Sequence, residues 1–189
     1  MLYRRYFKRP LDVVGAAIGV MALSPLMALV AILIWLDDGL PIIFRQQRIG
    51  LDGNTFTMYK YRSMPRNTPE LTSPLGRKMA VTRIGRVIRR LSIDELPQLY
   101  NVLQGDMSLV GPRPILVSMD KLIALRRKYG VLRFRPGLTG HAQLLGHDAM
   151  TEEEKALLDK QYCDDVTLRR DCSLMLYTIP YLFRTPPAD

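Results

Sequence analysis

The sequence from residue 92 to residue 114 reads Ser92-Ile-Asp-Glu-Leu-Pro-Gln-Leu-Tyr-Asn-Val-Leu-Gln-Gly-Asp-Met-Ser-Leu-Val-Gly-Pro-Arg-Pro114. Two adjacent carboxylates, Asp94 and Glu95, come just before Pro97. Helices tolerate proline in the first turn, where its missing N–H costs nothing, and not in the interior. We therefore predict that both acids lie at or near a helix N-terminus, where the helix dipole favours ionised carboxylates.

This acidic pair has two interpretations. Ser92 with Glu95 matches a capping box, and Asp94 could itself be the cap. The neighbouring residues favour a functional site, because Arg113 stands between two prolines that restrict the backbone on both sides. Acids beside fixed arginines suggest a site for a phosphorylated substrate. Further arginines lie just upstream, at Arg83, Arg86, Arg89 and Arg90.

The same stretch resembles the signature of the bacterial sugar transferases, the small monotopic phosphoglycosyl transferases that start glycoconjugate assembly. The resemblance rests on residues 94–99 (DELPQL) and 105–114 (GDMSLVGPRP). It extends to residues 44–50 (FRQQRIG), 59–64 (YKYRSM) and 135–140 (RPGLTG), and so covers nearly the whole chain. Arg89 matches an active-site arginine of the family. His141 departs from the pattern, and we interpret it as a satisfied structural histidine and not as a ligand or base.

The composition indicates an anionic partner. The 189 residues suit one modest domain, and 27 Lys and Arg against 18 Asp and Glu give a net charge of +9 and a pI near 9.8. Nucleic acid, an anionic membrane surface and phosphorylated substrates all fit this charge, but no nucleic-acid-binding motif accompanies it. Cys163 and Cys172 form no metal-binding pattern, which favours a reducing, cytosolic environment.

The N-terminal region predicts a membrane segment. An uncharged, mostly apolar run from Val13 to Leu36 would form about 36 Å of helix, enough to span a bilayer. However, Ser24-Pro25 falls in its middle, where proline removes a backbone hydrogen bond. Both flanks are also basic, which a straight span cannot reconcile with the positive-inside rule. We therefore expect a re-entrant helix that turns at Ser24-Pro25 and leaves by the same face, as the resemblance also implies.

The remaining chain predicts a small mixed domain. Residues 41–48 and 55–61 read as two strands joined by a Gly-rich turn, which predicts a hairpin in which Lys60 and Arg62 share one face. That face is either solvated or contacts substrate phosphates, and we favour the phosphates. Residues from Met79 onward form a basic amphipathic helix, which fits an anionic bilayer and a protein core equally well. Thr151 with Glu154 predicts a capping-box helix start.

These patterns together predict an α/β fold with two parts. Residues 1–40 would be the re-entrant membrane helix–break–helix with its basic flank. Residues 41–189 would be a helix-rich cytosolic catalytic domain with a short β-hairpin or sheet and amphipathic interfacial helices.

The resemblance implies a specific reaction. A sugar-1-phosphate passes from a UDP-sugar to polyprenyl (undecaprenyl) phosphate at the cytoplasmic face of the bacterial inner membrane, and UMP is released. Asp94 would be the nucleophile of a ping-pong mechanism with a covalent aspartyl phosphosugar. Glu95 would hold Mg²⁺. The substrate phosphates would be bound by Lys60, Arg62, Arg89 and Arg113. The sequence does not specify the sugar.

The alternative is a non-catalytic basic membrane protein that binds anionic lipid or nucleic acid. It explains the positive charge and the amphipathic helix, but gives no reason for adjacent Asp94 and Glu95 or for the proline-flanked Arg113. An Asp94→Asn variant separates the two hypotheses, because only the enzyme loses turnover.

Overall fold

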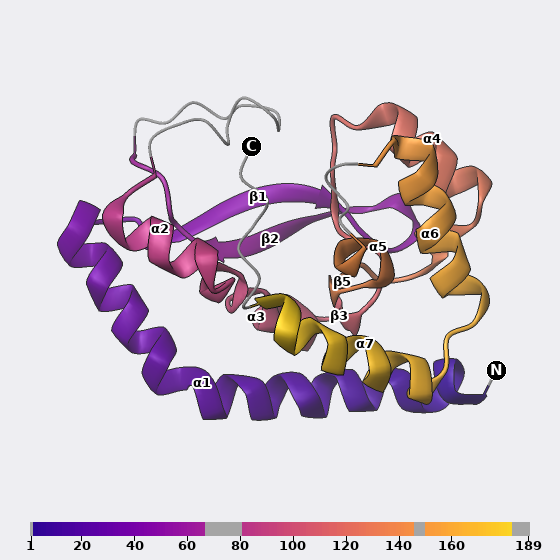
Figure 1. Cartoon of the computed structure of the whole chain (residues 1–189), viewed down its shortest axis with the longest axis horizontal. Coiled ribbons are helices and arrows are strands. Elements are labelled where there is room, and N and C mark those ends of the chain that lie inside the picture. Colours follow the sequence, from indigo (N-terminus) through magenta and orange to yellow (C-terminus); the bar gives the residue numbers. More distant parts are fainter. Residues whose placement is uncertain (1, 67–80, 146–149, 183–189) are drawn as a thin grey trace.

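The computed structural model describes residues 2–66, 81–145 and 150–182. It is a mixed helix and sheet structure, with a long N-terminal helix running along one side of the other elements (Figure 1). The chain begins with a π-helical turn, η1 (Tyr3–Phe7), which continues into α1 (Lys8–Asp38). The combined segment Tyr3–Asp38 is long and apolar enough to cross a membrane. This agrees with the predicted membrane anchoring of the N-terminal region.

Helix α1 is one continuous helix that bends (Figure 1), where the sequence predicts two helices separated by a break. Pro25 lies inside α1 and has no N–H to donate to the carbonyl of Met21, four residues earlier. The Ser24 hydroxyl donates to that same carbonyl oxygen at 2.9 Å. Because a side chain satisfies the acceptor that proline leaves free, the helix continues through the Ser-Pro pair.

The first half of α1 is attached to the rest of the protein by polar contacts. Arg9 Nη1 donates to the carbonyl oxygen of Val102 at 2.7 Å. The buried carboxylate of Asp12 accepts hydrogen bonds from Ser108 Oγ at 2.7 Å and from the backbone N–H of Leu109 at 3.1 Å. In the second half, Val30 and Ile34 are buried in a hydrophobic cluster.

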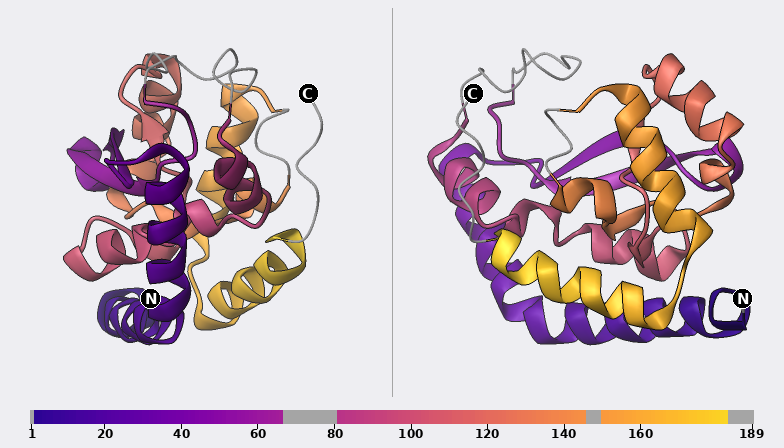
Figure 2. Two further views of the ribbon diagram at one scale, coloured as in Figure 1. Left: turned by 90° about the vertical axis from the view of Figure 1, so that its left-hand side faces the viewer. Right: turned by 45° about the vertical axis from the view of Figure 1, so that its right-hand side comes forward.

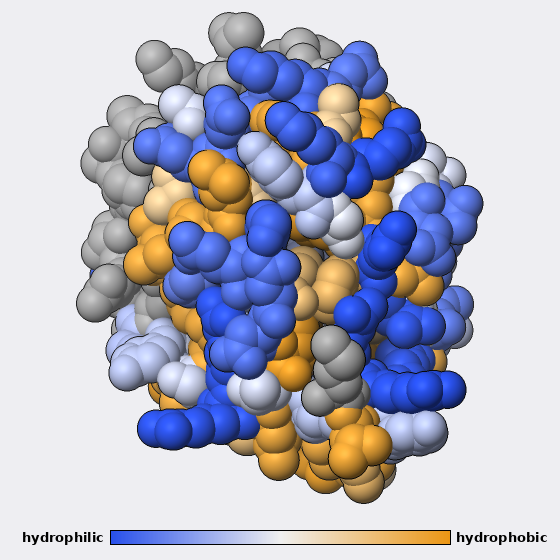
Figure 3. Space-filling model, turned by 90° about the vertical axis from the view of Figure 1, so that its right-hand side faces the viewer, coloured by the Kyte–Doolittle hydropathy of each residue, from blue (hydrophilic) through white to orange (hydrophobic). Residues whose placement is uncertain are grey.

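Other faces of α1 expose large apolar side chains, which a membrane would cover. Trp35 and Leu36 are 54% and 68% exposed, and Ile18, Met21, Leu29 and Ile32 are similarly exposed. Viewed from the right-hand side of Figure 1, hydrophilic side chains cover much of the upper part of the protein, and hydrophobic ones gather at the bottom (Figure 3), the level at which α1 lies in Figure 1.

The predicted hairpin is confirmed. β1 (Ile43–Ile49) pairs antiparallel with β2 (Thr55–Tyr61) across the short 3₁₀ turn η2 (Leu51–Gly53). A short strand, β4 (Ile115–Leu116), pairs with the other edge of β1, which gives the order β2-β1-β4. A separate parallel pair joins β3 (Ser108–Val110) to β5 (Gly137–Thr139).

Helix α3 (Gln98–Gln104) is attached to the free edge of β2 by one fully buried side chain. Asn101 Oδ1 accepts from the backbone N–H of Tyr59 at 3.1 Å, and its Nδ2 donates to the carbonyl oxygen of Thr57 at 2.7 Å. This amide takes the place of a neighbouring strand and fixes the distance between β2 and the acidic pair that precedes α3.

Helix α2 (Arg83–Arg90) buries Ile88 in the cluster that contains Val30 and Ile34 of α1. The core-facing interpretation is therefore confirmed for Ile88, although Val87 is 56% exposed. The hydroxyl of Thr82 caps α2 by accepting from the N–H of Gly85. The predicted start of this helix at Met79 lies outside the described residues.

The remaining helices are α4 (Asp120–Lys128), η5 (Val131–Arg133), α5 (His141–Leu144), α6 (Glu152–Asp164) and α7 (Leu168–Leu182). Of these, α4 and α6 lie at the right-hand end of Figure 1 and α7 lies beside α1 (Figures 1 and 2). Helix α6 begins with the predicted capping box of Thr151 and Glu154. Helix α7 runs roughly parallel to the first half of α1 and is tied to it, because Lys8 Nζ donates to the buried Asp171 carboxylate at 2.6 Å.

Candidate active site

The acidic pair lies in a 3₁₀ turn, η4 (Ile93–Glu95), and Pro97 follows it directly before α3. The predicted position next to a helix N-terminus is confirmed. The capping box predicted at Ser92 is wrong. Ser92 has φ 52° and ψ 22° and not the extended backbone of a cap, and its side chain makes no capping hydrogen bond. The carboxylates of Asp94 and Glu95 are therefore not used to cap α3.

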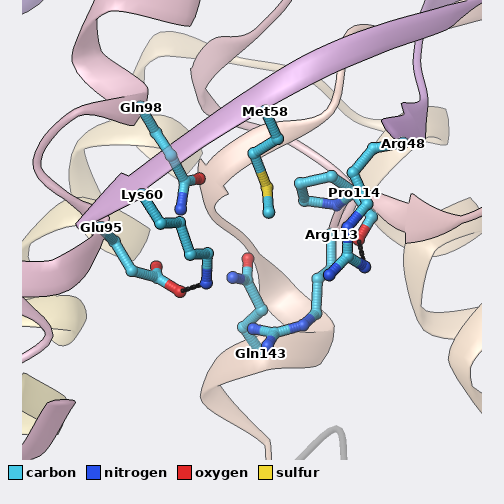
Figure 4. Close-up of a pocket in the computed structure, with 8 residues that line it drawn as sticks. All are labelled: Arg48, Met58, Lys60, Glu95, Gln98, Arg113, Pro114 and Gln143. Atoms are coloured by element: carbon cyan, nitrogen blue, oxygen red, sulfur yellow. Dashed lines mark hydrogen bonds and ion pairs between the residues drawn. The ribbon is translucent and has the colours of Figure 1, made fainter. Parts of the chain in front are cut away.

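A polar pocket opens beside this turn (Figure 4). Lys60 from β2 donates to Glu95 Oε1 at 2.6 Å. The amide groups of Gln98 and Gln143 point toward the centre of the pocket from α3 and α5. The full lining is Arg48, Met58, Lys60, Glu95, Gln98, Arg113, Pro114 and Gln143.

The pocket carries an excess of positive charge. Among the described residues that line it, Arg48, Lys60 and Arg113 are basic and Glu95 alone is acidic. Burial and the neighbouring guanidinium of Arg113 lower the pKa of Arg48 to about 10. Two arginines that face each other without a carboxylate between them repel, and an anion between them would remove this repulsion.

The two arginines are held by backbone contacts. Arg48 Nη1 donates to the carbonyl oxygen of Pro114 at 3.3 Å. The carbonyl oxygen of Arg113 accepts from Nη1 of the buried Arg126 at 2.7 Å, and Arg126 forms a buried ion pair with Asp159. The Arg48 side chain and the backbone at Arg113 are therefore fixed before any ligand binds, which lowers the ordering cost of anion binding.

Asp94 and Glu95 have opposite electrostatic environments. Burial raises the pKa of Asp94 to about 6, although Lys60 and Arg89 oppose this shift. Burial would also raise the pKa of Glu95, but the charges of Lys60, Arg113 and Arg48 outweigh it and hold that pKa below its usual value. At neutral pH both are ionised. Asp94 is the more basic carboxylate and so the better nucleophile, and Glu95 remains a permanent anion.

The structure brings most of the predicted site residues together. Lys60, Glu95 and Arg113 line the pocket. Arg89, in the last turn of α2, donates through Nε to Ser63 Oγ at 2.7 Å, and its charge acts on Asp94.

Arg62 does not join this group. Its Nη2 donates to the carbonyl oxygens of Asp38 and Gly39 at 2.9 and 2.7 Å, and forms an ion pair with the Asp38 carboxylate at 3.0 Å. The guanidinium thus binds the C-terminal end of α1, where the helix dipole favours a cation. The prediction that side chains alternate between the two faces of the strand holds for Lys60. Because β2 ends at Tyr61, this alternation does not extend to Arg62.

Sequence reasoning did not assign five of the residues that line the pocket: Arg48, Met58, Gln98, Pro114 and Gln143. Arg48 belongs to the motif FRQQRIG of residues 44–50, and its position on strand β1 was the feature that could have indicated a place in the site. Gln98 was present in the signature as well. Gln143 had no signal, because its placement depends on the packing of β5 and α5 against distant elements.

His141 and the cysteines lie outside the pocket. The ring of His141 is hydrogen-bonded to the backbone of Leu158, while its buried Nδ1 has no hydrogen-bond partner within the described part of the chain, so this structural histidine is satisfied only in part. Burial and the charge of Arg170 lower the pKa of His141. Cys163 and Cys172 are free thiols, and burial raises the pKa of Cys163 to about 12, which makes it unreactive.

The site has a donor set that suits Mg²⁺ together with a phosphorylated substrate. Among the described residues no group of three or more His, Cys, Asp or Glu side chains is arranged to hold a metal ion by itself. Mg²⁺ is commonly bound by one or two carboxylates plus substrate phosphates. Asp94 and Glu95 provide such carboxylates beside an anion-binding pocket.

Comparisons with known proteins agree with this chemistry. The profile of the family described as bacterial sugar transferase matches residues 3–185. The chain is 42% identical over 190 residues to the UDP-glucose:undecaprenyl-phosphate glucose-1-phosphate transferase of Caulobacter vibrioides, with 96% of this chain and 71% of that protein covered.

Longer relatives match over part of their length. The UDP-N-acetylgalactosamine-undecaprenyl-phosphate N-acetylgalactosaminephosphotransferase of Aeromonas hydrophila is 37% identical, over 92% of this chain and 43% of that protein. The undecaprenyl-phosphate galactose phosphotransferase of Salmonella typhimurium is 35% identical, over 95% of this chain and 41% of that protein. The chain belongs to the bacterial sugar transferase family and is a phosphoglycosyl transferase.

Proposed function

We propose that the protein transfers a sugar-1-phosphate from a UDP-sugar to undecaprenyl phosphate through a covalent intermediate on Asp94. The observation that carries this proposal is the basic Asp94 carboxylate beside a pocket with three cations and one acid. A nucleoside diphosphate sugar carries two negative charges, which match the excess charge of the pocket. Three relatives are named for transfer to undecaprenyl phosphate, which supports this acceptor.

The first step forms one bond to phosphorus and breaks another. A carboxylate oxygen of Asp94 attacks the phosphorus that bears the sugar, and the bond from that phosphorus to the bridging oxygen breaks. UMP leaves with the electron pair, and Asp94 carries the sugar phosphate. Lys60 and Arg113 bind phosphate oxygens and stabilise the charge that moves to UMP, and Arg89 keeps Asp94 ionised.

In the second step a phosphate oxygen of undecaprenyl phosphate attacks the same phosphorus. The bond to Asp94 breaks, the carboxylate is restored, and the product is an undecaprenyl diphosphate sugar. The acceptor is already an anion, so this step needs no general base.

Glu95 is the residue that would hold Mg²⁺, with the diphosphate providing further oxygens. When bound, the ion neutralises charge on the diphosphate, which allows an anionic nucleophile to approach. The lowered pKa of Glu95 keeps this ligand ionised throughout the working pH range.

The membrane arrangement is part of the proposal. The bend in α1 and the basic residues on both of its flanks support a re-entrant path, in which both ends of α1 return to the cytoplasmic face of the inner membrane. Residues 1–40 would then be the membrane part and residues 41–189 the cytosolic catalytic domain. Exposed apolar residues of α7, such as Leu176 and Ile179, support interfacial contact of that helix.

Isotope exchange tests the covalent mechanism. Radiolabelled UMP is incubated with the detergent-solubilised protein, Mg²⁺ and each UDP-sugar of a panel, without acceptor. A covalent intermediate predicts label in the UDP-sugar, and none with Asp94→Asn. Turnover with acceptor but no exchange would refute the intermediate and indicate direct transfer. Neither exchange nor turnover with any donor would favour the non-catalytic alternative.

A further inference from the structure

A second pocket, of about 430 Å³, lies between α5 and α7. Its walls are mainly apolar and include Leu144, Leu145, Leu174 and Tyr177. Arg170 and His141 are its basic residues among those described, and burial and the charge of Arg170 lower the pKa of His141, which favours the uncharged ring. An apolar cavity of this size fits a hydrocarbon better than a sugar or a nucleotide, because the walls leave most hydroxyl groups unpaired.

Helix α5 separates this pocket from the polar one. Gln143 lines the polar pocket, and its neighbours in sequence, Leu144 and Leu145, line the apolar pocket. One short helix therefore presents an anion-binding cavity and a hydrocarbon-binding cavity on different sides. A single amphiphilic ligand, with a phosphate group next to an apolar chain, needs an anion-binding cavity and a hydrocarbon-binding cavity beside each other.

The helix that forms one wall of the apolar pocket is also attached to the predicted membrane segment. Helix α7 forms one wall, and Lys8 and Tyr3 at the start of the membrane segment both bind its Asp171 at 2.6 and 2.7 Å. Tyr177, which lines the pocket, is 66% exposed, and the neighbouring Leu176 and Ile179 extend the apolar surface. A hydrocarbon chain could thus pass from the bilayer into the pocket without crossing a polar surface.

We infer that the pocket between α5 and α7 binds the isoprenoid chain of the acceptor next to its phosphate. The inference rests on the proposed function for the identity of the acceptor. A cavity of about 150 Å³ holds one benzene molecule, so 430 Å³ holds on the order of three five-carbon isoprene units. The remainder of a long polyprenyl chain stays in the bilayer.

Photocrosslinking tests the inference without relying on turnover. Geranylgeranyl phosphate with a diazirine on an internal isoprene unit is irradiated with the full-length protein in nanodiscs, and labelled peptides are mapped by mass spectrometry. Label is expected on residues 141–145 and 173–180. Ser173→Trp, which fills the pocket with an indole, should reduce this label severalfold. Label found only on α1, or label unchanged by Ser173→Trp, would overturn the inference.

Cys172→Trp is the matched control, because Cys172 lies on the same helix and is exposed but does not line the pocket. It should keep the label of the wild-type protein. Thermal melting of both variants checks that they fold. Equal loss of label in the two variants would contradict the inference, because it would show a general effect of α7 on membrane contact.

Kinetics then separate the inference from the proposed function. Displacing even two buried methylene groups changes affinity about tenfold, so Ser173→Trp should raise the KM for undecaprenyl phosphate by about that factor. UMP exchange needs only the donor and reports whether the Asp94 site of the variant is intact. If exchange fails in the wild type, the proposed function is wrong, yet the crosslinking result still decides whether the pocket binds the lipid. An unchanged KM would count against the pocket.

Discussion

The environment of Asp94 predicts that the wild-type carboxylate lowers the stability of the protein. The folded-state pKa is about 6 against an ordinary value of 3.8, because burial disfavours the charged form. A rise of about two in the pKa corresponds to about 3 kcal/mol in the free energy of unfolding, at about 1.36 kcal/mol per pKa unit. Solvent screens a half-buried side chain, so the expected effect is about 1–3 kcal/mol. Asp94→Asn keeps the shape and removes the charge.

The pH dependence of this effect has a definite sign. Well below pH 3.8 Asp94 is protonated in the folded and unfolded states, so the charge should make no difference in stability between the variant and the wild type. As the pH rises from about 4 to about 6, the unfolded state ionises first and the wild type loses stability relative to Asp94→Asn. Above about pH 6 the difference should stay constant, with the variant melting several degrees higher.

The assay is thermal melting of the detergent-solubilised protein between pH 4 and pH 8. Glu95→Gln provides a control of opposite sign. The pKa of Glu95 is lowered, so that carboxylate stabilises the protein above its unfolded pKa and the variant should melt lower than the wild type at neutral pH. An Asp94→Asn difference that is zero or independent of pH would refute the reasoning, because the carboxylate would then not be desolvated.

Three further outcomes are expected. Turnover, measured as kcat against pH, should fall about tenfold per pH unit below about pH 6, because Asp94 becomes protonated. A flat profile down to pH 5 would contradict the assignment of Asp94 as the nucleophile. Gly85→Ala should destabilise by about 1–3 kcal/mol in thermal melting, because a Cβ there would lie 2.1 Å from the carbonyl oxygen of Ser63; an unchanged melting temperature would show that α2 is not held this closely. Asn101→Ala should cost about 2–4 kcal/mol by leaving buried backbone groups, including the N–H of Tyr59, unpaired; increased hydrogen exchange confined to β2 would confirm the site of the loss.

Local patterns of the sequence predicted much of the fold. The β1–β2 hairpin and the Thr151 capping box follow from turn residues and side-chain chemistry within a few positions, and both are confirmed. The Ser92 capping box failed because its backbone is left-handed, which the residue types did not indicate. The Ser24-Pro25 break became a bend because the serine hydroxyl satisfies the freed carbonyl.

The candidate site was predictable where its residues share one segment. Asp94, Glu95 and Arg113 lie in one signature, and strand alternation placed Lys60 beside them. Arg48 and Gln143 come from elements that meet only in the folded protein, so no local pattern assigned them. Arg62 was misplaced for the same reason: its partner, the end of α1, is brought to it by packing.

The most direct test of the mechanism is the intact mass of the protein after incubation with Mg²⁺ and each UDP-sugar, without acceptor. The account predicts one sugar phosphate added to the wild type by the correct donor and none added to Asp94→Asn. That result would identify the nucleophile and the sugar together. An unmodified wild-type mass with a donor that still supports UMP release in the presence of undecaprenyl phosphate would contradict the account.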